Sequence, residues 1–123
     1  MKRIVVFFWL LNCLSIVVLW AVTLATGHGW QQGLFAYQNG NIPMFHLLAE
    51  ISMAIVTLAG LAGWLRARRW GPPLALLGAG MFGYSAINSM GWAIHNQPAL
   101  AIPMGLSLIA LPPLFAQVCR SSA

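Results

Sequence analysis

Acidic residues are almost absent from this sequence, since Glu50 is the only one among 123 residues. Charged residues of either sign make up 6% of the chain, whereas a soluble domain carries about a quarter. Aspartic dyads and two-metal centres are excluded because a single carboxylate cannot build them. Cysteine is scarce as well: Cys13 and Cys119 form no CxxC pattern. We expect both cysteines to be small buried apolar residues rather than a redox pair.

Long apolar runs account for most of what is present, and apolar residues make up 60% of the chain. Each run is close to the ~20 residues that cross a hydrocarbon core about 30 Å thick. No run alternates polar and apolar residues, and in lipid the backbone must satisfy its own hydrogen bonds, so the runs predict helices. The sequence therefore predicts an all-α protein, an integral membrane four-helix bundle with one domain over residues 1–123 and helices at approximately 4–26, 43–65, 73–93 and 98–119.

Positive charge is confined to three short segments, near residues 2–3, 66–69 and 120. With four spans these segments fall on one side of the membrane, and the loops on the other side, 27–42 and 94–97, contain no Lys or Arg. This positive-inside pattern predicts that both termini are cytoplasmic and that the protein lies in a cytoplasmic (inner) membrane of the bacterial type. The basic residues are expected to contact anionic lipid headgroups rather than nucleic acid.

The second apolar run, PMFHLLAEISMAIVTLAGLAGWL, carries Glu50 inside a membrane span. A carboxyl group in hydrocarbon is costly, so an ionisable residue there is a functional-site hypothesis. His46 precedes Glu50 by one helical turn on the same face. On an antiparallel third helix, Asn88 and Tyr84 are expected at depths that flank Glu50. The predicted ligand-binding residues are His46, Glu50, Thr57, Tyr84, Ser85 and Asn88.

Three hypotheses explain this polar cluster. The first is an outward-facing site, centred on Glu50 and His46, that binds and moves a small solute or ion. The second is a redox membrane protein with a haem or copper site ligated by histidine and methionine, with His28, His46 and His95 as the candidate histidines, although no HxxM, HxxxH or CxxCH spacing supports it. The third is a structural network in an accessory subunit of a larger membrane complex. We favour the first because a neutral Gln would join helices at lower cost than Glu50.

Enzymatic activity has less support in the sequence. The chain offers no nucleophile with an adjacent base and no set of carboxylates for a metal. Acid–base chemistry by His46 and Glu50 stays open as an alternative, and the sequence predicts binding rather than catalysis.

Small residues recur every fourth position in the third run, at Ala75, Ala79 and Gly83. This pattern permits close approach of two membrane helices. A bundle of four helices seldom encloses a full path, so we expect a homo-oligomer or a partner membrane subunit, with this face as the candidate interface.

Other residues predict how the first and last runs pack. Asn12 is expected to bond a neighbouring helix, and Trp9 and Trp20 are expected to face lipid. Pro103 and the pair at 112–113 fall inside the last run and predict a bent helix.

Overall fold

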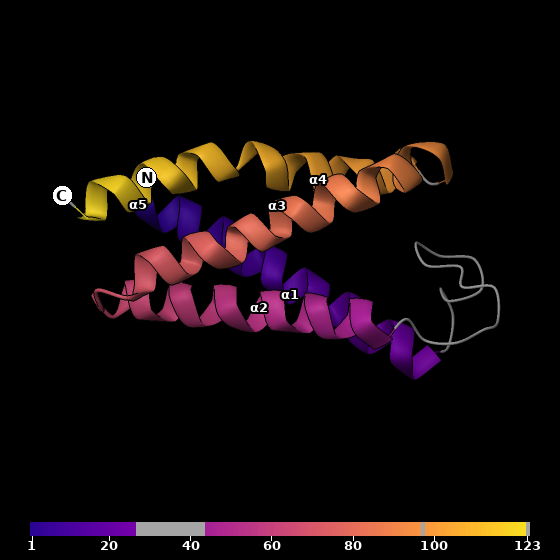
Figure 1. Cartoon of the computed structure of the whole chain (residues 1–123), viewed down its shortest axis with the longest axis horizontal. Helices are drawn as coiled ribbons and strands as arrows, with labels where there is room; N and C mark the ends of the chain where they lie inside the picture. Colours follow the sequence, from indigo (N-terminus) through magenta and orange to yellow (C-terminus); the bar gives the residue numbers. More distant parts are fainter. Residues whose placement is uncertain (27–43, 97, 123) are drawn as a thin grey trace.

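The computed structural model describes residues 1–26, 44–96 and 98–122. The loop predicted on the outer surface, 27–42, lies outside the described residues. No strand occurs within the described ranges, which confirms the all-α prediction. The five helices in this part of the chain are α1 (Lys2–Thr26), α2 (Met44–Leu65), α3 (Gly71–Asn96), α4 (Pro98–Ile109) and α5 (Leu111–Ser122) (Figure 1).

A tight turn connects α2 and α3 and makes them antiparallel neighbours, as the short connection predicts (Figure 1). The N–H of Arg68 donates to the carbonyl of Gly63 at 2.8 Å, and the N–H of Ala67 donates to the carbonyl of Trp64 at 3.1 Å. Ala67 has a φ of 55°, which is the left-handed conformation that ends a helix in a Schellman motif. These bonds satisfy carbonyl groups at the end of α2 without water, and the chain reverses its direction within a few residues.

Glycines allow α2 and α3 to approach until their backbones nearly touch. A β-carbon added to Gly60 would lie 2.1 Å from the backbone nitrogen of Ala75. One added to Gly78 would lie 2.1 Å from the hydroxyl oxygen of Thr57 and 2.7 Å from its Cα. The two helices therefore form one tightly packed hairpin, against which the remaining helices are placed.

The small-residue face of α3 packs inside the chain and is not free for another subunit. Ala75 and Ala79 are completely buried, and Gly83 is buried where an added β-carbon would lie 2.7 Å from Leu111. The pattern thus correctly predicts close helix packing, but its partners are α2 and the α4–α5 arm of the same molecule.

The last apolar run forms two helices instead of one bent helix. The α-helical pattern stops at Ala110, and α5 begins at Leu111 and continues along the same side of the molecule (Figure 1). The prolines at 112–113 occupy the first turn of α5, where a missing N–H costs nothing. Pro103 lies within α4. The break therefore follows from the double proline, which cannot continue the hydrogen bonding of α4.

Three segments of the described chain are long and apolar enough to cross a membrane, which is characteristic of a membrane protein. The helix α3 is not one of them, because its glycines, serines and Asn88 lower its hydropathy, and yet it packs against α2, α4 and α5. The three segments are Lys2–Val22, Leu47–Leu65 and Ala101–Ser121.

The main core contains one residue for which the sequence predicted another environment and one whose burial it predicted correctly. Trp9, expected to face lipid, is fully buried, with its ring edge-to-face on Phe82 at 5.7 Å between centroids. Cys13 is fully buried as predicted, whereas Cys119 is exposed. Position along an apolar run does not tell which face of the helix meets the bundle, and this explains the error at Trp9.

Candidate functional site

Glu50 lies on α2 and is buried, with 8% of its surface exposed. Trp20 on α1 donates its indole N–H to the Oε2 atom of Glu50. Ser85 on α3 donates its hydroxyl to the Oε1 atom at 3.1 Å. The carboxylate therefore connects three helices, and each of its oxygens accepts a hydrogen bond from a different one.

Trp20 is the site residue that the sequence analysis missed. It was expected to face lipid, but only 5% of it is exposed and it lies against Leu47 and Ile16. A buried tryptophan usually finds a partner for its N–H, and the acid on the adjacent span was a possible acceptor. That signal is present in the sequence, but a separation of 30 positions between Trp20 and Glu50 does not fix how α1 and α2 align along each other.

A cavity of about 270 Å³ lies beside Glu50 and between four helices. Its walls combine apolar side chains with a small number of hydroxyl and amide groups, which is the usual composition of a small-molecule site. The lining residues are Asn12, Ser15, Ile16 and Leu19 of α1, Glu50 and Met53 of α2, Phe82, Ser85, Ala86 and Ser89 of α3, and Pro103, Met104 and Ser107 of α4.

A second polar contact lies in the wall of this cavity. Ser107 of α4 donates its hydroxyl to the Oδ1 atom of Asn12 on α1 at 2.7 Å. The amide nitrogen of Asn12 donates to the carbonyl of Phe8 in its own helix at 3.1 Å. The prediction that Asn12 bonds a neighbouring helix is confirmed, and the bond ties α1 to α4.

The structure brings only some of the predicted site residues together. Ser85 reaches the carboxylate of Glu50. Thr57 is fully buried against Gly78 and donates to the carbonyl of Met53 at 2.8 Å, and it does not line the cavity.

Tyr84 and Asn88, predicted beside Glu50, lie on the outer surface of α3. Tyr84 is 75% exposed, and Asn88 is exposed as well. The cause is the rotation of α3: its small-residue face packs inward, which turns the stripe with Tyr84 and Asn88 away from the bundle. Ser85 lies between the two faces and is the member of this group that reaches the site.

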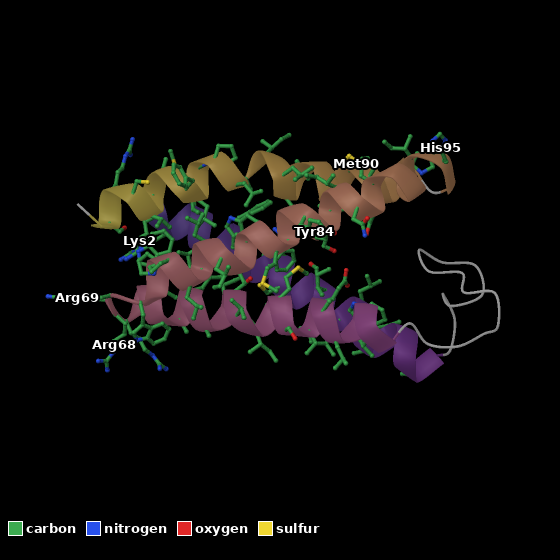
Figure 2. The ribbon with its side chains drawn as sticks, viewed as in Figure 1. Lys2, Arg68, Arg69, Tyr84, Met90 and His95 are labelled. Carbon is green, nitrogen blue, oxygen red and sulfur yellow. The ribbon has the colours of Figure 1, made fainter. Side chains whose placement is uncertain are left out.

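The three histidines proposed as metal ligands are not assembled in the described part of the molecule. His28 and the side chain of His46 lie outside the described residues, although the backbone of His46 belongs to α2, one turn before Glu50. His95 is exposed in the last turn of α3 (Figure 2). Among described residues, no group of three His, Cys, Asp or Glu side chains is close enough to hold a metal ion.

The comparisons with known proteins identify a family but not an activity. No curated protein and no solved structure matches this sequence. One family model, described as a domain of unknown function (DUF8058), matches residues 1–120, a range that includes all the residues lining the cavity. The chain therefore belongs to the DUF8058 family.

Proposed function

We propose that this protein binds a small solute or ion at an intramembrane site centred on Glu50, and moves it across the membrane. The membrane is of the bacterial cytoplasmic type, and both termini face the cytoplasm. In support, Lys2, Arg68 and Arg69 lie at one end of the molecule and His95 lies at the other (Figure 2). Both chain ends lie at the basic end (Figure 1). A cluster of basic residues at one end is the charge asymmetry that fixes membrane orientation.

The observation that carries the proposal is a buried carboxylate in the wall of a cavity. Glu50 is 8% exposed and borders a space of about 270 Å³ with largely apolar walls. Membrane proteins retain ionisable groups at such depth mainly on ion and substrate pathways, because a structural contact can be made more cheaply by neutral groups. The surrounding hydroxyl groups of Ser85 and Ser89 and the amide of Asn12 can orient a bound molecule.

A structural role in an accessory subunit is the second candidate, and one observation favours it. Glu50 accepts hydrogen bonds from Trp20 and Ser85, which joins α2 to both α1 and α3. A network of this kind can fix how helices pack without any ligand. The two candidates differ in what Glu50→Gln changes: solute binding under the first, and the stability of the bundle or capture of a partner subunit under the second.

The haem or copper hypothesis has less support. The exposed His95 and the lack of a ligand cluster among described residues leave it dependent on His28 and His46. An absorption spectrum and metal analysis of the purified protein test it directly.

The binding proposal is tested by screening the purified protein in detergent against a panel of small cationic, neutral and anionic compounds. Thermal stabilisation of the protein gives the readout. The variant Ala86→Leu fills the cavity, since Ala86 is a buried lining residue. The matched control Ala116→Leu adds the same side chain at an exposed position of α5.

We expect compounds that stabilise the wild type and Ala116→Leu but not Ala86→Leu. Uptake of such a compound into proteoliposomes, and its loss in Glu50→Gln, then tests transport. A panel in which no compound distinguishes Ala86→Leu from Ala116→Leu contradicts a binding function for the cavity. Co-purification of a partner subunit with wild type but not with Glu50→Gln would support the structural role instead.

A further inference from the structure

The face of α3 that points away from the bundle carries a continuous stripe of exposed residues, here called the outer stripe. Its members recur at alternating intervals of three and four, which is the spacing of a helix face that packs against a parallel helix. A β-carbon added to Gly80 or Gly91 would meet nothing within 4 Å, so no described residue covers the stripe there. The members of the outer stripe, all of them exposed, are Leu77, Gly80, Tyr84, Ile87, Gly91 and Ile94.

The exposed face of α1 shows how a lipid-facing surface of this protein is composed. It presents large apolar side chains such as Leu11 and Val18. The outer stripe differs, because two of its six members are glycines and Tyr84 carries a hydroxyl group. Tyr84 lies about midway between the ends of α3 (Figure 2), whereas tyrosines that face lipid collect at the two membrane surfaces. The stripe therefore fits the surface of another protein better than it fits lipid.

The charge asymmetry of the molecule restricts how two copies can meet. Every copy has the same orientation in the membrane, because the end with Lys2, Arg68 and Arg69 stays on one side (Figure 2). Two copies are then related by a twofold axis along the membrane normal, and α3 of one copy lies parallel to α3 of the other. In such a contact each residue of the outer stripe faces the same residue of the second copy.

The composition of the outer stripe suits contact with itself. The stripe contains no Lys, Arg, Asp, Glu or His, so no like charges meet across the axis. Gly80 and Gly91 allow the two backbones to approach closely. The hydroxyl of Tyr84 is both a donor and an acceptor, so the two phenols of a pair can bond to each other. A shallow groove beside Gly80, bordered by Val118 of α5, gives room to the large side chains of the second copy.

From these observations we infer that the outer stripe of α3 binds a second copy of this chain, which forms a parallel twofold dimer in the membrane. The inference rests on the membrane orientation proposed above and not on the ligand of the cavity. Each copy keeps its own cavity, because the α3 residues that line it lie on the opposite side of the helix. These lining residues are Phe82, Ser85, Ala86 and Ser89.

Disulfide cross-linking in the membrane tests this inference, because a disulfide forms only when two Cα atoms lie within about 7 Å. The test variant is Ile87→Cys in the outer stripe, and the control is Leu48→Cys at an exposed position of α2. Both positions lie about 25 Å along their helices from the α2–α3 turn, so their depths match. The exposed Cys119 is replaced by alanine, and the buried Cys13 is retained. On mild oxidation with copper phenanthroline we expect a covalent dimer in Ile87→Cys and none in Leu48→Cys.

Two leucine substitutions test the close approach of the two helices. Gly80→Leu in the Ile87→Cys chain places a branched side chain at the contact and is expected to abolish the covalent dimer. Gly105→Leu on α4 is the matched control, because nothing lies within 4 Å of a β-carbon at either glycine. It is expected to leave the dimer unchanged. Sedimentation equilibrium of the unmodified protein in micelles, for which we expect the mass of a dimer, decides the inference even if a variant fails to fold.

A mixture of Leu77→Cys and Ile94→Cys chains tests the direction of the helices. These positions lie at opposite ends of the outer stripe, so a parallel dimer gives no disulfide between them. A disulfide between them would show an antiparallel contact and overturn the inference. Equal cross-linking at Ile87 and Leu48, a monomeric mass, or capture of a different protein by Ile87→Cys would also overturn it. The ligand screen with Ala86→Leu gives its result independently, so loss of the dimer leaves the binding proposal in place.

Discussion

The two halves of the molecule differ in how densely their side chains pack. The packed half surrounds Trp9, Leu61 and Leu114, all fully buried, in one cluster with Trp64, which contacts Lys2. The cavity half surrounds Glu50 and leaves a space of about 270 Å³ among four helices. Dense packing of one half fixes the helices, so the other half can retain a polar space without collapsing around it.

The two tryptophans of α1 show the same contrast within one helix. Trp9 in the packed half stacks edge-on against Phe82, and its N–H has no hydrogen-bond partner among the described residues. Trp20 in the cavity half donates its N–H to Glu50. Both side chains are buried, so the same residue type fills volume in one half and supplies a polar contact in the other.

The largest effect is expected where α2 meets α3 in the packed half. Gly60→Ala places a methyl group 2.1 Å from the backbone nitrogen of Ala75, so the two helices must move apart. We expect the free energy of unfolding to fall by about 3 kcal/mol, the upper end of the usual range for overpacking. Reversible unfolding in mixed micelles, followed by circular dichroism, measures the change.

Gly80→Ala is the matched control, because nothing lies within 4 Å of a β-carbon at Gly80. This substitution is expected to leave stability unchanged or to raise it by up to about 1 kcal/mol, the advantage of Ala over Gly in a helix. Equal losses at Gly60 and Gly80 would contradict the close contact between α2 and α3 at Gly60.

Much of the packed half could be predicted from the sequence. Apolar runs predict the helices, and the spacing of Ala75, Ala79 and Gly83 predicts a close helix contact. The partner of that contact could not be predicted, because small residues permit close approach without specifying whether another helix of the chain or another molecule provides it. The end of α4 was only partly predicted, since the double proline at 112–113 indicates a bend but not its size.

The position of the cavity half could be predicted from the sequence, but the set of side chains that forms the site could not. Glu50 could be singled out because it is the only acidic residue in the sequence and lies within a predicted span. The position of Ser85 near Glu50 could be predicted from the antiparallel arrangement of α2 and α3. The rotation of α3 about its own axis could not be predicted, because small and polar residues occupy two of its faces. Hydropathy does not indicate which of these faces packs inward. Tyr84 was therefore placed at the site, and Trp20, whose helix is joined to α2 by a long connection, was not.

A second prediction compares the tryptophans directly. Trp9→Phe and Trp20→Phe remove the same indole ring, but only the second breaks a hydrogen bond to Glu50. The loss of unfolding free energy is expected to be greater for Trp20→Phe by about 1.5–3 kcal/mol, the usual contribution of a hydrogen bond to a charged group. Unfolding titrations of both variants measure the difference, and equal losses would contradict a structural contribution from the Trp20–Glu50 bond.

A third prediction concerns the bond between α1 and α4 at the far end of the cavity. Ser107→Ala removes the donor to Asn12 and is expected to cost about 0.6 kcal/mol, the average for hydrogen bonds between membrane helices. Ser52→Ala is the control, because Ser52 is exposed and, within the described part of the chain, donates to the carbonyl of Leu48 in its own helix. A loss at Ser52 as large as that at Ser107 would indicate that the α1–α4 bond adds nothing to stability.

The smallest effects are expected on the outer face of α3. Tyr84→Phe and Asn88→Ala alter exposed side chains that do not line the cavity. Each should change the free energy of unfolding by no more than about 0.5 kcal/mol, as is usual for surface substitutions. Affinity for a compound from the binding screen that Ala86→Leu excludes should stay within about twofold of the wild type, which corresponds to less than ~0.5 kcal/mol.

Ser85→Ala is the matched change one position from Tyr84, and it removes a donor to Glu50. It should weaken the binding of such a compound where the two outer variants do not, because the hydroxyl of Ser85 holds the carboxylate at the cavity wall. The three variants together measure the rotation of α3 in solution. If Asn88→Ala weakened binding and Ser85→Ala did not, α3 would present its other face to Glu50, and the boundary between the packed half and the cavity half would have to be redrawn.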